Sequence, residues 1–175
     1  WYHVACTYSG SGTSAGTKIY VNGVKVDNAN EQSGTYVAME NTANSMRFSD
    51  TEYLKGKLDE VKIYNYERSQ TQILEDMNGG RTNSMLIAFW KFDEGYGTTA
   101  NDASGNNNSL LLNSASWSKS GKFGSAWNGT GATWTCRTTG SCDADSDFDF
   151  AAADDFTIST WFKSDSASNP ASAAE

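Results

Sequence analysis

The chain has 175 residues, of which 38% are hydrophobic and 13% aromatic, so it can bury the core of one ordinary domain and is not expected to be disordered. Its formal net charge of −8 argues against nucleic acid as a partner, because such a composition predicts no basic patch that displaces counterions from phosphates. No apolar run approaches the length of a membrane-spanning helix, so membrane insertion is not expected either.

The first third of the chain predicts short strands. Residues 1–8 alternate, with Tyr2, Val4, Cys6 and Tyr8 on one face. Residues 17–26 predict a hairpin, since Asn22-Gly23 is the favoured pair for a two-residue type I′ turn. A short strand is predicted at 46–49.

Residues 58–65 predict a strand that carries a carboxylate among apolar residues. Strict alternation places Asp59 on the same face as Val61 and Ile63, with Glu60 and Lys62 on the opposite face. An ionised carboxylate on an apolar face is costly unless a cation or several donors meet it. Two interpretations stay open: an aspartate near the rim, hydrogen-bonded to a neighbouring loop, or a ligand of a bound metal.

After this strand, Ser69 is expected to cap a short helix over residues 69–77, which has an apolar side. The triplet Asn78-Gly79-Gly80 ends it, and residues 78–85 are interpreted as a linker. Further strands are predicted at 86–92, 109–113, 125–128, 132–137 and 156–162. In the last of these, Trp161 lies on the face opposite to Phe156, Ile158, Thr160 and Phe162. Many strands separated by turn signals, with one helix, predict an all-β, antiparallel β-sandwich.

Several of these segments resemble a known family. WYHVACTY, KIYVNGVKV and LKGKLDEVKIYNYERSQTQI resemble the closing half of a laminin-G-like, concanavalin A-like (lectin/glucanase) jelly-roll domain. LIAFWKFDEGYGTTANDASGNNNS, GKFGSAWNG and DDFTISTWFK resemble the opening half of the same domain type. The resemblance therefore implies a jelly-roll β-sandwich.

The closing half precedes the opening half, which implies an excerpt of a longer protein that straddles two tandem repeats. We expect residues 1–77 to be the closing half, 78–85 the linker and 86–175 the opening half. The halves either stay incomplete or pair as one permuted, gapped sandwich. Pairing is favoured because it buries two apolar faces.

The resemblance also implies a calcium ion. In the family, the loop that matches residues 101–108 often helps to hold calcium, so Asp102, Asn106 and Asn108 are expected as ligands together with Asp59. The alternative is an Asx-rich turn whose side chains bond their own backbone. The run from Asp143 to Asp149 is interpreted as a solvated acidic turn, because it lacks the glycine and the final glutamate of an EF-hand loop.

Other candidates are less specific. Cys136 and Cys142 could close a disulfide-bonded turn, although spacing alone does not establish the geometry. Exposed aromatic side chains can stack on sugar rings, and Trp134, Trp161 and Tyr53 are the candidates, with a core position as the alternative for each tryptophan.

No catalytic motif occurs, and the paired carboxylates of the retaining relatives are missing, so we expect no enzyme activity. The resemblance implies an extracellular or cell-surface recognition module that binds glycan or protein, with a structural calcium ion. The alternatives are a spacer repeat of a large adhesin-like protein without a ligand of its own, and a targeting module attached to a glycan-active enzyme.

Overall fold

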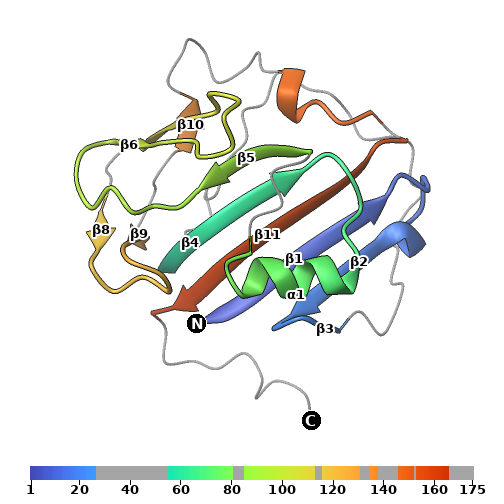
Figure 1. Cartoon of the computed structure of the whole chain (residues 1–175), viewed down its shortest axis with the longest axis horizontal. Coiled ribbons are helices and arrows are strands. Elements are labelled where there is room, and N and C mark those ends of the chain that lie inside the picture. Colours follow the sequence, from blue (N-terminus) through green and yellow to red (C-terminus); the bar gives the residue numbers. More distant parts are fainter. Residues whose placement is uncertain are drawn as a thin grey trace.

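The computed structural model describes residues 1–26, 55–80, 85–112, 116–130, 135–137, 146–151 and 153–165. Within these ranges the protein is mostly antiparallel β-structure with short helices (Figure 1), which confirms the predicted fold class. The strands are β1 (Tyr2–Ser9), β2 (Thr17–Val21), β3 (Val24–Lys25), β4 (Lys55–Tyr64), β5 (Leu86–Trp90), β6 (Thr99–Ala100), β7 (Leu110–Leu112), β8 (Trp117–Ser118), β9 (Ala126–Thr130), β10 (Thr135–Arg137) and β11 (Asp155–Ser164). The helices are η1 (Ser14–Gly16), α1 (Gln70–Met77) and η2 (Ser146–Phe148).

Two sheets carry these strands. The larger has the order β3-β2-β1-β11-β4-β9-β8, with β5 also paired to β4, and the smaller has the order β10-β7-β6. Strand β11 lies between β1 and β4, so segments from both sides of residues 78–85 share one sheet (Figure 1). The division of the chain into two halves at these residues stays a prediction.

The predicted hairpin is confirmed. Asn22 and Gly23 have φ of 50° and 77°, as a type I′ turn requires, and they join β2 to β3. Two strands of two residues each, β6 and β8, were not predicted, because so short a segment shows no periodicity. The predicted strand at 46–49 lies outside the described residues, as does the start of the one at 132–137.

Strand β4 departs from strict alternation, and this overturns the predicted orientation of Asp59. Leu58 and Val61 both belong to the buried core although they are three residues apart, because the strand bulges between them. The bulge is at Glu60, whose φ of 53° is left-handed. Asp59 therefore lies on the face of the sheet opposite to Val61 and Ile63.

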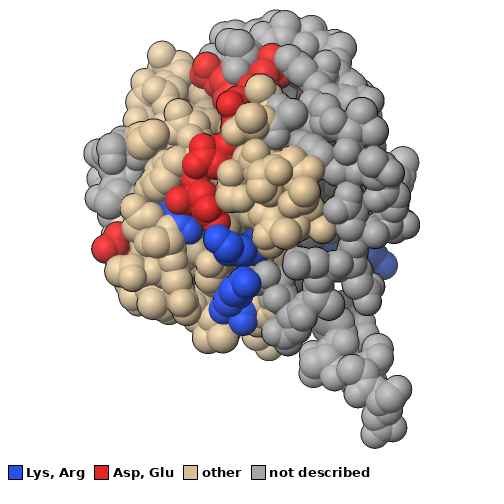
Figure 2. Space-filling view, turned by 90° about the vertical axis from the view of Figure 1, so that its right-hand side faces the viewer, with Lys and Arg blue, Asp and Glu red and all other residues tan. Residues whose placement is uncertain are grey.

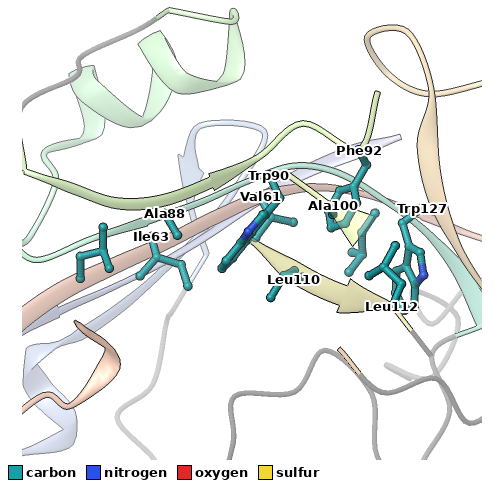
Figure 3. Close-up of a cluster of buried hydrophobic side chains, with 11 residues drawn as sticks. Val61, Ile63, Ala88, Trp90, Phe92, Ala100, Leu110, Leu112 and Trp127 are labelled. Carbon is teal, nitrogen blue, oxygen red and sulfur yellow. The ribbon is translucent and has the colours of Figure 1, made fainter. Parts of the chain in front are cut away.

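The main core fills the space between the two sheets. Trp90 and Trp127 are fully buried there, together with Phe92, and β7 closes the core from the smaller sheet with Leu110 and Leu112 (Figure 3). The bulge also divides the edge of β4, so that residues 55–58 pair with β9 and residues 61–64 pair with β5. One long strand thus joins both parts of the core.

Helix α1 packs on the outer face of the larger sheet (Figures 1 and 3). Ser69 caps it in a capping box with Gln72, as predicted, and Ile73 is buried against the sheet. Asp76 anchors the helix, since its carboxylate lies 2.8 Å from Nε of Arg68 and accepts a 2.7 Å hydrogen bond from the Tyr64 hydroxyl. None of the described helices is long and apolar enough to cross a membrane.

Candidate functional site

The first candidate site is built around Asp59, which is fully buried. Its Oδ2 accepts hydrogen bonds from the backbone N–H groups of Lys122, at 2.6 Å, and Phe123, at 2.9 Å. The first of the two interpretations from the sequence is thus correct in part: the carboxylate bonds a neighbouring loop. Its other oxygen, Oδ1, is buried and has no hydrogen-bond partner among the described residues.

Burial dominates the electrostatics of Asp59 and raises its pKa from 3.8 to about 7. The two backbone donors oppose this shift, whereas the charges of Glu60 and Asp93 add to it. A carboxyl group in this position needs either a proton or a cation near neutral pH. Because only one of its two oxygens accepts hydrogen bonds, the carboxylate of Asp59 needs a further partner.

The loop over residues 119–125 connects Asp59 to a second carboxylate. Its Ser125 N–H donates a 3.0 Å hydrogen bond to Oδ1 of Asp93, just as its earlier amides bond Asp59. Gly121 permits this approach, because a Cβ there would lie 2.9 Å from Oδ2 of Asp59 and closer still to the Ser125 carbonyl. The glycine-rich GKFG segment was noted in the sequence only as part of the family resemblance, and Asp93 was not singled out.

A calcium ion fits part of this arrangement. Calcium prefers oxygen ligands, and the buried Oδ1 of Asp59 is such an oxygen with no other partner among the described residues. Asp93, which follows β5 and accepts a hydrogen bond from the same loop, is a further carboxylate. The described residues contain no group of three or more acidic, histidine or cysteine side chains that could hold a metal, so main-chain oxygens or water would have to complete the coordination.

The predicted loop ligands lie in a second place. Asp102 accepts four hydrogen bonds: Oδ1 from the N–H groups of Phe89 and Ser104, and Oδ2 from the hydroxyl of Ser104 and the N–H of Asn108. These distances run from 2.7 to 2.9 Å. The Asx-rich turn that the sequence left open as an alternative is therefore what the contacts of Asp102 describe.

The two asparagines of this loop also make structural contacts. Asn106 Nδ2 donates to the carbonyls of Leu86 and Ile87, and Asn108 Nδ2 donates to the same Ile87 carbonyl at 2.9 Å. Asn108 is fully buried and bonds Oδ2 of Asp147 as well, at 3.1 Å. The structure thus brings together three of the four predicted metal ligands, while Asp59 makes its contacts with the other loop.

Beside the asparagine loop the surface is hollowed. The hollow has a volume of about 660 Å³, and its lining includes Asp147, Asp149, Asp154, Asp155, Asn106 and Phe150. Figure 2 shows acidic side chains gathered in a stripe on the face that it presents. Asp147 and Asp149 in this lining belong to the run that the sequence predicted to be a solvated acidic turn.

The aromatic candidates receive little support as sugar platforms. Trp161 is only 6% exposed, and it is covered by Phe123 and by the Lys122 ammonium, which lies 4.1 Å from the ring centroid. A ring in this position has no free face on which a sugar could stack. Tyr53, Trp134 and the side chains of the predicted Cys136–Cys142 disulfide lie outside the described residues.

Comparison with known proteins gives one match. Residues 1–74 match the family model described as the concanavalin A-like lectin/glucanases superfamily, a laminin-G-type model. The matched segment runs from β1 into α1 and contains Asp59, so the resemblance inferred from the sequence is confirmed there, and with it the jelly-roll architecture of that superfamily. No curated protein and no solved structure matches the chain.

Proposed function

We propose that this protein is a non-catalytic recognition module of the cell surface or extracellular space, which binds carbohydrate or protein and holds a structural calcium ion at Asp59. The observation that carries the calcium proposal is the fully buried carboxylate with one oxygen unpartnered among the described residues. Burying such a group as an anion is unfavourable unless a positive charge meets it.

The residues that would hold the ion are Asp59, through Oδ1, and Asp93. The ion would supply the positive charge that lets Asp59 stay ionised at neutral pH. Both carboxylates already accept hydrogen bonds from the loop over residues 119–125, so an ion between them would fix that loop to β4. The ion is therefore expected to stabilise the folded protein rather than to take part in a reaction.

The hollow beside β5 supports the recognition part of the proposal. Carboxylates accept hydrogen bonds from sugar hydroxyls, and asparagine side chains such as Asn106 both donate and accept them. A hollow of about 660 Å³ is within the usual size of a small-ligand site. Phe150 in its lining adds apolar surface for a sugar ring.

The buried histidine supports a non-catalytic function, because its contacts serve the packing of the sheet. His3 is 1% exposed, and its Nε2 lies 3.0 Å from Oγ of Ser159, which is itself buried. Burial, with the nearby charge of Lys62, lowers the pKa of His3 to about 4. A histidine–serine pair without access to solvent has no room for a substrate.

Thermal unfolding with excess calcium and with chelator tests the metal. Calcium should raise Tm by roughly 5–10 °C, since a ligand at about 100 times its Kd adds about 2.7 kcal/mol and each kcal/mol shifts Tm by about 2–4 °C at this size. Asp59→Asn should abolish the increase and Asp93→Asn should reduce it. The matched control Asp149→Asn removes one carboxylate from the hollow and should keep it.

An unchanged Tm in the parent protein, or the same calcium effect in Asp59→Asn, contradicts the metal site. The recognition function is tested separately on a glycan array with folded, calcium-loaded protein. Binding that Asp149→Asn and Asn106→Ala weaken would support the hollow. No binding to any glycan would favour the spacer alternative.

A further inference from the structure

We propose a second binding surface, for acidic glycans that carry sulfate or carboxylate groups, on the outer face of the larger sheet. It consists of Lys55, Lys57, Lys122 and Lys163, here called the lysine strip. The inference rests on the proposed carbohydrate recognition and names a ligand class for it. The surface is separate from the hollow and adjoins the proposed calcium site, since the backbone N–H of Lys122 donates to Oδ2 of Asp59.

The register of the strands gathers these lysines. Lys57 on β4 lies directly opposite Lys163 on β11, and Lys55 follows on the same face of β4 because alternate residues share a face. This is the face of Asp59 and Trp161, and the Lys122 ammonium lies over the Trp161 ring. Figure 1 shows that α1 covers β1 and β2 but not this end of β4 and β11.

The strip is electrostatically unfavourable as it stands. Like charges directly opposite one another on a sheet destabilise the pair. Among the described ion pairs, one acid relieves the strip, since Asp165 lies 2.9 Å from the ammonium of Lys57. Lys55 and Lys163 are exposed. A ligand with two or more negative charges would relieve the repulsion between Lys57 and Lys163.

The acidic character of the whole chain does not cancel this local charge. The aspartates of the hollow stand at the opposite end of the same strand: Asp155 begins β11 and Lys163 lies near its end. Ten residues of strand span about 30 Å, whereas charges in physiological salt are screened over about 8 Å. A basic surface therefore exists in a chain whose net charge of −8 argued against one.

The geometry favours a glycan over a compact anion. Asn128 on β9 pairs with Lys57, so an amide, Lys57 and Lys163 form a row across three neighbouring strands. Neighbouring strands lie about 4.8 Å apart, which makes the row about 10 Å long. Oδ1 of Asn128 is buried, so the row presents to a ligand the two ammonium groups of Lys57 and Lys163.

Fluorescence anisotropy with three labelled hexasaccharides tests the proposal: one sulfated, the same one desulfated, and one of uronic acids. The parent protein should bind the sulfated or the uronic acid probe at least tenfold more tightly than the desulfated one, and the tighter of the two identifies the charged group. The double variant Lys57→Gln/Lys163→Gln should weaken that binding about tenfold, since each exposed charge contact contributes a factor of a few.

The matched control is Lys18→Gln/Lys25→Gln, which removes the same charge from β2 and β3. It should leave the affinity within about twofold, because Lys18 pairs with Glu67 rather than with the strip. Equal losses in both double variants would overturn the site. So would equally tight binding of single-stranded DNA of the same charge, since the surface would then select charge alone.

The outcomes also separate this inference from the proposed function. Binding of neutral glycans to the hollow, without any preference for the charged probes, overturns the lysine strip and leaves the recognition module standing. Failure to bind any glycan, charged or neutral, overturns the lysine strip together with the carbohydrate recognition on which it rests. Because the glutamine variants remove a repulsion, their Tm should not fall by more than a few degrees, which excludes unfolding as the cause of lost binding.

Discussion

Asp59 and Asp102 are two aspartates that the sequence assigned to one metal site, and the structure gives them different surroundings. Asp102 accepts four hydrogen bonds, two at each oxygen, all from donors on its own loop or on β5. Asp59 accepts two, both at Oδ2, and its buried Oδ1 has no partner among the described residues. Burial raises the pKa of Asp59 to about 7.

The two aspartates differ in burial as well as in donors, since Asp59 is fully buried and Asp102 is half-buried. Donors on both oxygens can replace water around the charged form, and the side chain then organises the loop. Donors on one oxygen leave part of the desolvation cost uncompensated, so the group takes up a proton or a cation. Asp102, in a loop rich in asparagine, is thus the weaker candidate for a metal ligand, and Asp59 is the stronger.

The largest expected effect is the pH dependence of stability without calcium. The unfolded carboxyl of Asp59 ionises near pH 3.8, whereas the folded one keeps its proton up to about pH 7. The folded state binds more protons between these values, so the contribution of Asp59 is full below pH 3.8 and is lost as the pH rises to 7. The loss is at most about 4 kcal/mol.

Urea unfolding of the parent protein and of Asp59→Asn, from pH 4 to 8 in chelator, measures this contribution. Asparagine mimics the neutral carboxyl. The free energy of unfolding of the variant should therefore increase relative to that of the parent protein as the pH rises. His3 acts in the opposite sense, because its pKa of about 4 makes stability rise between pH 4 and 6.5. Since His3 is present in both proteins, its effect cancels, and a constant difference would contradict the comparison.

A smaller effect is expected from Asp102→Ala, which removes an acceptor shared by four donors. The free energy of unfolding should fall by about 2–3 kcal/mol, because the buried backbone N–H groups that it serves lose their partner. Chemical unfolding with and without calcium is the measurement. The loss should be the same in both conditions, and a loss confined to calcium-loaded protein would return Asp102 to the metal site.

The smallest effect is expected at the bulge that turns Asp59 away from the core. Glu60→Gly should stabilise the protein by about 1 kcal/mol, since glycine adopts a φ of 53° without steric cost. Glu60→Ala is the matched control, because it removes the same charge near Asp59 and keeps the strained backbone. If alanine stabilises as much as glycine, the charge rather than the backbone is responsible.

The sequence predicted most strands because alternation and turn residues are local signals. It placed Asn22-Gly23 in a hairpin and Ser69 at a helix start, where neighbouring residues alone decide the geometry. It failed at Asp59, where strict alternation was assumed and a single left-handed residue reversed the face. It also assigned no site to Asp93 or the lysine strip, whose members are distant in the sequence.

What the sequence determined by itself was the fold class and the family resemblance that residues 1–74 confirm. It also predicted Asp59 as a carboxylate in need of a partner. The tertiary structure alone decided which residues that carboxylate meets, because its amide donors come from a loop more than sixty positions away. It alone also decided the pairing of Lys57 with Lys163. Strand register brings distant residues together through backbone hydrogen bonds, and it cannot be predicted from composition or net charge.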